Sequence, residues 1–568
     1  MCVTMIFCLF FHSSIIVVLL ICYSRWLDEE TLADICLYSL VIELCFAIFN
    51  ISYIYYTDSI FFLNCGYILV DIFYVNISII FCFDELSGFF FGILDFALIL
   101  CFYFLIEYFE YDSNSSGIIL LSSIFSHLAL WYFCVFDLFL LILFWEGISL
   151  VSFLLIQHWS YRLPTYKAGI KVFFISQLGD IPLFIFIFMM VNRFGTTDLT
   201  EVMSQLFLVS FEYIILYNLS ILISFSGLAA FSLSFALLLK SAQFFFYPWL
   251  LDAMEAPVPI SAQLHSSTLV IIGFYFYLRF QNLFIMAPMT SNLLLIFGIC
   301  TVIGASILGF FQEDGKKLLA CSTASQLGYA VTGLGLFYFE ESLLLMVFCC
   351  CNKAFTFIWF GTLMDRYSGI SDFRFISGIF GLSFLEHAGI LISLANFTVL
   401  PGAFSWHVKA LFIKGQYLHE TFIIKYALDI LSLTWFFSSL YLIYLYIILF
   451  LKPSRGTSRV SVHILSNTVA NVELGIRMLF STTTILYLFK YIRNYKILVK
   501  WNFFIFLFFS SNSIQSRRMS GSFFLLLCCS FIFLIQLTNC WYYTYIDMSW
   551  ICDTFYFYNF VINDLYIA

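Results

Sequence analysis

The sequence predicts an all-α polytopic membrane protein with about 15–16 transmembrane helices, and two observations lead to this fold class. Of the 568 residues, 63% are hydrophobic and only 10% are charged, whereas soluble proteins average about 25% charged residues. The apolar residues form blocks of roughly 20 residues, long enough to cross a hydrocarbon core of about 30 Å as helices. This composition excludes a soluble enzyme, a nucleic-acid-binding protein and a single-span receptor.

Short polar joints separate the apolar blocks, which define the expected helices. The blocks are 1–24, 32–57, 60–82, 88–106, 117–136, 138–157, 168–192, 206–240, 259–279, 286–311, 317–338, 342–364, 383–415, 421–451, 465–489 and 501–545. Met1–Leu20 has no basic residue before its apolar run and no small-residue cleavage site after it, which favours a retained span over a secretory signal. Prolines and polar residues at membrane depth in Lys240–Pro259 and Leu400–Lys414 are typical of broken helices at transport sites.

The 18 cysteines show no metal-binding pattern. They are scattered through apolar runs, and no pair has the CxxC spacing of zinc or iron–sulfur sites. In such surroundings a cysteine usually serves as a small apolar helix residue. We therefore expect no metal ion or cluster in this chain.

Five ionisable residues lie alone in or beside apolar blocks: Glu146, Asp180, Lys240, His265 and Lys353. A charge at the centre of a membrane helix costs about 2.5–3.5 kcal/mol, so these residues are expected to face one another or water. For any one of them, a buried ion pair that stabilises helix packing is the alternative. As a set they indicate a proton relay, because a buried lysine holds or releases its proton according to the distance of a carboxylate.

Basic residues are concentrated near the carboxy terminus. Lys452–Arg518 contains ten basic residues and one acidic residue, Glu473, although the net charge of the chain is −9. The positive-inside rule places this region on the cytoplasmic or matrix side. The pattern fits equally a helix lying on the membrane surface and the basic anchor of a spanning helix.

Several motifs follow one another along the chain. They are Asp84-Glu85-Leu86-Ser87, the segment Trp145–Ile156, Gln177-Leu178-Gly179-Asp180, the segment Lys240–Thr268, the segment Ser322–Tyr329, and Asn352-Lys353-Ala354-Phe355. Together they resemble the antiporter-like subunits of NADH–quinone oxidoreductase, respiratory complex I, most closely the distal one. The resemblance covers roughly residues 80–450, and the Lys240–Thr268 segment is highly specific.

The resemblance implies antiporter-like inverted repeats with broken helices and three regions along the chain. Residues 1–116 would be amino-terminal transmembrane helices, and 117–450 an antiporter-like proton-translocating core. Residues 451–568 would be a basic carboxy-terminal extension with a lateral or amphipathic helix and a final transmembrane span.

The resemblance also implies site roles by position. Glu146 matches the glutamate that pairs with the broken-helix lysine, here Lys240, and Asp180 matches an aspartate near that pair. His265 matches the histidine that bridges the two halves. Lys353 matches the central lysine.

Lys409 matches the lysine of the second broken helix, through which the proton reaches the outer side. Relatives usually have histidines four and eight residues before the central lysine, where this chain has Cys349 and Leu345. The acidic residue that usually follows directly is missing after Lys409, where the chain continues with Ala410-Leu411-Phe412. Because of these departures, two alternatives stay open for the proton exit route. Either water molecules fill the gap in this half-channel, or the half-channel itself is altered.

The function implied is a proton-translocating membrane-arm subunit of NADH:ubiquinone oxidoreductase, in which redox energy released elsewhere moves protons along the buried residues. No cofactor is expected in this chain, because FMN and the iron–sulfur clusters would lie in other subunits, and NADH and ubiquinone would be substrates of the whole complex. The alternatives are an Mrp-type monovalent cation/proton antiporter subunit and a packing subunit with inactive channels.

The resemblance implies partners and a location as well. The partners would be the neighbouring antiporter-like subunit, other membrane-arm subunits, accessory subunits and the lipid bilayer, with no nucleic acid. The location would be the mitochondrial inner membrane. The high content of phenylalanine and tyrosine also fits a thymine-rich genome, as organelle genomes often are. A bacterial plasma membrane is the alternative.

Overall fold

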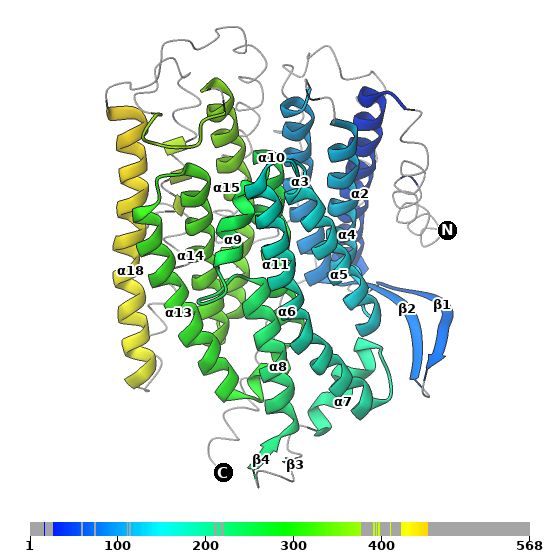
Figure 1. The fold of residues 1–568 in the computed structure, drawn as a ribbon. Coiled ribbons are helices and arrows are strands. Elements are labelled where there is room, and N and C mark those ends of the chain that lie inside the picture. The colour runs from blue at the N-terminus through cyan, green and yellow to red at the C-terminus, as the bar shows by residue number, and fades with distance from the viewer. Residues whose placement is uncertain are drawn as a thin grey trace. The chain divides into compact units, whose positions relative to one another are not determined.

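The computed structural model describes residues 16, 27–57, 61–72, 75–110, 112, 115–209, 213–216, 221–367, 369–376, 390–391, 393–394, 396–397, 409 and 422–452 (Figure 1). The chain divides into two compact units, Met1–Ser510 and Ser511–Ala568, and the second lies outside the described residues. The predicted lateral helix and final span of the extension, and all of its basic residues after Lys452, also fall outside them. The region boundaries at 116 and 450 stay predictions.

Long apolar helices make up the first half of the described chain. They are α2 (Glu29–Thr57), α3 (Glu85–Tyr108), α4 (Ser115–Cys134), α5 (Leu138–Ile156) and α6 (Leu163–Phe194), followed by the shorter α7 (Leu199–Val209). Lipid offers no hydrogen-bond partner to the backbone, so apolar segments satisfy their peptide groups as helices. Polar residues fix the ends: Asp137 accepts backbone N–H bonds from Phe139 and Leu140 at the start of α5. Gly195 ends α6 in the left-handed conformation, with φ of 73°.

The second half contains α8 (Phe225–Lys240), α13 (Pro288–Phe311), α14 (Gly315–Gly335), α15 (Phe339–Arg366) and α18 (Phe422–Tyr446), which continues into the π turn η3 (Ile447–Leu451). Within the described residues, 8 helices are long and apolar enough to cross a membrane. This confirms the all-α polytopic class. The polar helix α14 is not one of the 8, and it is buried along nearly its whole length, so it needs no apolar outer face.

Two predicted helices are wrong. Block 60–82 forms the antiparallel strands β1 (Phe61–Ile72) and β2 (Val75–Phe83), and part of block 206–240 forms β3 (Tyr213–Leu216) and β4 (Ile221–Ser224). These segments are rich in isoleucine, valine, phenylalanine and tyrosine, which favour strands. Apolar content alone does not separate a short buried strand from a helix, and so the prediction failed there.

The predicted broken helix after Lys240 is confirmed. Ala242 and Phe245 have φ of 51° and 73°, which a continuous helix does not tolerate. The chain then proceeds through short elements: α9 (Pro248–Asp252), the 3₁₀ turn η1 (Ala253–Glu255), α10 (Val258–Ala262), the π turn η2 (Gln263–Ser267), α11 (Leu269–Arg279) and α12 (Gln281–Ile285). Of the second predicted break, Leu400–Lys414, only Lys409 is among the described residues.

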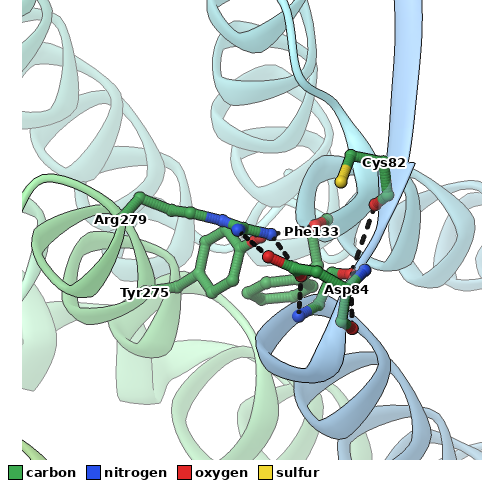
Figure 2. A network of polar contacts seen from close by, with 6 residues as sticks. Cys82, Asp84, Phe133, Tyr275 and Arg279 are labelled. Carbon is green, nitrogen blue, oxygen red and sulfur yellow. Dashed lines mark hydrogen bonds and ion pairs between the residues drawn. The ribbon is translucent and has the colours of Figure 1, made fainter. Parts of the chain in front are cut away.

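A polar network ties the ends of α3, α4 and α11 together (Figure 2). Arg279 forms a bidentate pair with Asp84, with Nη2 2.8 Å from Oδ1. Arg279 Nε donates to the Tyr275 hydroxyl at 2.8 Å, and that hydroxyl donates to the Phe133 carbonyl at 2.6 Å. Burial alone would raise the pKa of Asp84, but the Arg279 guanidinium outweighs it, and the pKa lies below its usual value.

Helix packing brings the ionisable residues toward one another. Helix α6 packs along α8, α5 along α6, α14 along α15, and α15 against α3. The first two contacts join Glu146, Asp180 and Lys240, and the third joins α14 to Lys353.

Candidate functional site

The side chains of Asp180 on α6 and Lys240 on α8 meet at Trp145 on α5. The Trp145 indole N–H donates to Asp180 Oδ1 at 2.6 Å, and Lys240 Nζ lies 4.7 Å from the centroid of the Trp145 ring. Asp180 and Lys240 are only 2% and 3% exposed. In the described part of the chain, Asp180 Oδ2 and Lys240 Nζ make no hydrogen bond. The ammonium group is therefore held by an aromatic face and by carboxylate charge.

Glu146 lies one residue after Trp145 and is half-buried. Its Oε2 accepts a hydrogen bond from the Gln177 amide at 2.9 Å. The carboxylates of Asp180 and Glu146 both interact electrostatically with Lys240. Two carboxylates from α5 and α6 thus share one lysine at the end of α8.

His265 lies in the π turn η2 and is 3% exposed. Its ring centroid is 6.2 Å from that of Trp249, and neither ring nitrogen has a hydrogen-bond partner among the residues the structure describes. A neutral imidazole has one donor and one acceptor nitrogen, so it can accept a proton at one nitrogen and give up the proton at the other.

Lys353 and Lys409 are buried beside α14. Lys353 Nζ donates to the Ser322 hydroxyl and, at 3.3 Å, to the Leu319 carbonyl, and it lies 4.0 Å from the centroid of the Phe397 ring. Lys409 Nζ lies 4.4 Å from the centroid of the Tyr329 ring. The exposed fractions of Lys353 and Lys409 are 2% and 0%.

The structure places Cys349 close to both lysines. Its thiol interacts electrostatically with Lys409 and Lys353 and donates to Gln326 Oε1 at 3.9 Å, whereas Leu345 is buried and apolar. Sequence reasoning missed Ser322 and Gln326 as site residues. They are four residues apart on α14 and so share one face, a signal already present in the Ser322–Tyr329 motif.

The described residues contain no group of three or more His, Cys, Asp or Glu side chains arranged to hold a metal ion. The site has six protonatable side chains. They are Glu146, Asp180, Lys240, His265, Lys353 and Lys409.

Residues 135–432 match the family model of the transmembrane region of the NADH:quinone oxidoreductase/Mrp antiporter proteins, which is more than half of the 568 residues. The chain belongs to this family. The matched region includes all six protonatable residues of the antiporter-family site.

Relatives and a solved structure agree with this membership. NADH-ubiquinone oxidoreductase chain 5 of Schizophyllum commune is 30% identical over 75% of this chain and 61% of that protein. Chain 5 of Marchantia polymorpha is 30% identical over 67% of this chain and 57% of that protein, so this antiporter-family chain spans about three fifths of these relatives. A chain of the membrane-bound sulfane sulfur reductase, an archaeal respiratory membrane complex, shares the fold with a TM-score of 0.68 at 15% identity, covering 85% of this chain and 96% of that one.

Proposed function

We propose that the chain is a proton-translocating membrane-arm subunit of NADH:ubiquinone oxidoreductase. The observation that carries the proposal is that Lys240, His265, Lys353 and Lys409 are each at most 3% exposed in a chain of the antiporter family. Unpaired charges at membrane depth are expensive, so protonation of such groups responds strongly to nearby charge. The names of the relatives support the assignment to this oxidoreductase.

The proposed relay begins where two carboxylates share Lys240. Trp145 fixes Asp180, and Gln177 fixes Glu146. A lysine keeps its proton while a carboxylate is close and gives it up when the carboxylate moves away or is neutralised. Lys240 would then pass a proton to His265, whose imidazole relays it toward Lys353.

The second half of the relay runs beside α14. Lys353 would receive the proton against the Ser322 hydroxyl, and Lys409 would release it on the outer side. Cys349 interacts electrostatically with both lysines and donates to Gln326. In this proposal they take the place of the histidines that relatives usually have.

We also propose that this chain binds no redox cofactor itself. FMN and the iron–sulfur clusters would lie in other subunits, and NADH and ubiquinone would be substrates of the whole complex. The proposed partners are the neighbouring antiporter-like subunit, the other membrane-arm subunits and accessory subunits. The proposed location is the mitochondrial inner membrane, in line with relatives named NADH-ubiquinone oxidoreductase chain 5, and a bacterial plasma membrane is the alternative.

An Mrp-type monovalent cation/proton antiporter subunit is the second candidate, since the family includes both kinds of protein. Such a protein would exchange sodium ions for protons down a pH gradient without any electron transfer. The names of the relatives favour the oxidoreductase.

A native gel of gently extracted membranes tests the proposal. The gel would be stained for NADH dehydrogenase activity, and this chain would be located by mass spectrometry. We expect it in a large band with NADH dehydrogenase activity. Its presence only in a small band without flavin would contradict the proposal, and pH-gradient-driven sodium exchange in vesicles would then test the antiporter alternative.

A further inference from the structure

A second group of buried ionisable residues lies outside the row from Glu146 to Lys409. Glu43, Asp95 and His127 lie near the middle of α2, α3 and α4, three helices that pack against one another (Figure 1). Their exposed fractions are 1%, 0% and 6%. Mid-helix positions in spans of this length lie deep in the membrane, where ionisable residues are rare and usually functional.

The hydrogen bonds around His127 restrict the positions of the protons on this histidine and on Glu43. His127 Nδ1 lies 2.9 Å from Glu43 Oε1, and Nε2 lies 2.9 Å from the Ser39 hydroxyl. Ser39 donates to the Cys36 carbonyl at 2.7 Å, and in this arrangement its oxygen accepts a hydrogen bond from Nε2 of the tautomer protonated there. The contact between Nδ1 and Glu43 then contains one further proton, which is bonded either to the imidazole or to the carboxyl group.

Asp95 adds a second carboxyl group to this pair. Neither of its oxygens has a hydrogen-bond partner in the part of the chain that the structure describes, and Glu43 is the charged group that acts on it electrostatically. An unpaired carboxylate in apolar surroundings costs far more than the neutral acid. Two carboxyl groups that repel each other when ionised tend to retain a proton between them.

Among the described residues, no permanently charged cation is paired with the carboxyl groups of this cluster. From α4, the Trp131 indole donates to Glu43 Oε1 at 3.2 Å, and the Cys134 thiol interacts electrostatically with Glu43. Among the described residues, His127 is the only basic side chain paired with Glu43, and none is paired with Asp95. Protons are therefore the charges that can balance the two carboxyl groups.

Aromatic side chains separate this cluster from the Lys240 site. The Trp131 ring, bonded to Glu43, lies 6.1 Å from that of Phe144 on α5. Its neighbour Tyr132 lies 6.1 Å from the Trp145 ring, which bonds Asp180. Contacts between aromatic rings of α4 and α5 thus lie next to both sites.

We propose that Glu43, Asp95 and His127 form a second proton-binding site, in which the His127–Glu43 pair shares one proton and Asp95 holds another. In the binding step the Asp95 carboxylate takes a proton from a hydronium ion of the solvent and becomes a neutral acid, and one water molecule is released. The proposal goes beyond the proposed function and does not depend on it, because proton occupancy is a property of the resting protein.

Infrared difference spectroscopy of the purified full-length protein in its native complex tests the proposal. A protonated carboxyl group has a carbonyl-stretch band that shifts when H₂O is replaced by D₂O. We expect such a band in the wild type and its loss in Asp95→Asn, whereas the control Ser122→Ala, a buried change on α4, keeps it. A band that persists unchanged in Asp95→Asn would overturn the proposal.

Two further measurements also test the proposal. If Asp95→Asn does not assemble, Glu43→Gln serves instead. It removes the partner with which His127 shares the proton, so the wild-type infrared band of the group that carries this proton, a doubly protonated imidazole or a protonated Glu43 carboxyl, should be lost. Persistence of that band would refute the shared proton. Sodium ions added to the wild type should leave the acid band in place. A band removed by sodium would identify a cation site and overturn the assignment to protons. Normal pumping in Lys240 variants would contradict the proposed function but would not alter these readouts.

Discussion

At the scale of the residue, Trp145 has two separable interactions. Its indole N–H bonds Asp180, while its ring face lies against the Lys240 ammonium. Trp145→Phe keeps an aromatic face but removes the donor. Because a hydrogen bond to a charged group contributes about 1.5–3 kcal/mol, we expect proton pumping by the intact complex to fall by about tenfold or more. Pumping would be measured with a pH-sensitive dye in proteoliposomes.

Tyr132→Phe is the matched control for that variant. Tyr132 is fully buried and lies 6.1 Å from the Trp145 ring, but its hydroxyl has no hydrogen-bond partner in the described segments. We expect pumping close to the wild-type rate. Equal losses in both variants would show that Trp145 acts by packing alone.

The sequence indicated which residues matter at this scale but not what they touch. Lys240 and Asp180 were predicted from their isolation in apolar blocks, and both are buried. Gln177 and Ser322 were recognised only as parts of motifs and were not predicted as site residues, because a neutral polar side chain has no obvious cost in such a block. Their contacts with Glu146 and Lys353 cross between helices, and spacing along one helix cannot reveal a contact with another.

At the scale of the element, the Asp84–Arg279 pair joins the start of α3 to the end of α11. Asp84→Asn leaves the buried Arg279 charge without its partner. Removing one member of a buried pair costs about 3–5 kcal/mol, and we expect the lower end because a fifth of the Asp84 side chain is exposed. Thermal inactivation of the purified complex would measure the loss.

The pH dependence of that loss follows from the lowered pKa of Asp84. A carboxyl group whose pKa is lower in the folded state stabilises the protein fully above its unfolded pKa, about 3.9, and loses this contribution as the pH falls through the folded value. The difference between wild type and Asp84→Asn should therefore stay constant from pH 7 to about pH 5 and shrink only below about pH 4. Asp372→Asn, which breaks a pair with the 62% exposed Arg374 side chain, should cost much less.

Gly335, at the end of α14, tests how closely α14 packs against α13. A methyl group there would lie 2.8 Å from the Leu295 backbone nitrogen and 2.9 Å from the Ser291 carbonyl oxygen on α13. Backbone atoms cannot move away locally, so Gly335→Ala should separate the two helices and cost about 1–3 kcal/mol. Gly117→Ala on α4, with nothing within 4 Å, should leave thermal stability unchanged or higher, and equal losses would refute the packing argument.

Elements were predictable where a local rule decided them. Prolines and polar residues marked the break after Lys240, and the structure has it there. The strands β1 to β4 were not predictable from apolar content, because strand pairing depends on a partner segment as well as on the segment itself. The second break at Leu400–Lys414 stays a prediction.

At the scale of the whole molecule, composition was enough for the fold class because 10% charged residues cannot cover a soluble surface. It was less informative about α14, which is polar and almost entirely buried. Such a helix is possible only inside a ring of apolar helices. Its Ser322, Gln326 and Tyr329 side chains place polar groups beside Lys353 and Lys409 without exposing them to lipid.

At this scale, the proposed relay from Glu146 to Lys409 predicts that electron transfer elsewhere in the complex is coupled to proton pumping through this chain. Lys240→Ala removes the charge that Glu146 and Asp180 share, so we expect proton pumping to fall at least about tenfold, as for a lost interaction of over 1.4 kcal/mol. Lys240→Arg keeps a cation but one that does not release its proton, so pumping should also be lost. The rate of NADH oxidation by the assembled complex would be measured together with the rate of pumping. The comparison would show whether the redox reaction slows with pumping or continues uncoupled. Full pumping in both variants would mean that the buried ionisable residues only stabilise helix packing, and the proposed relay would be wrong.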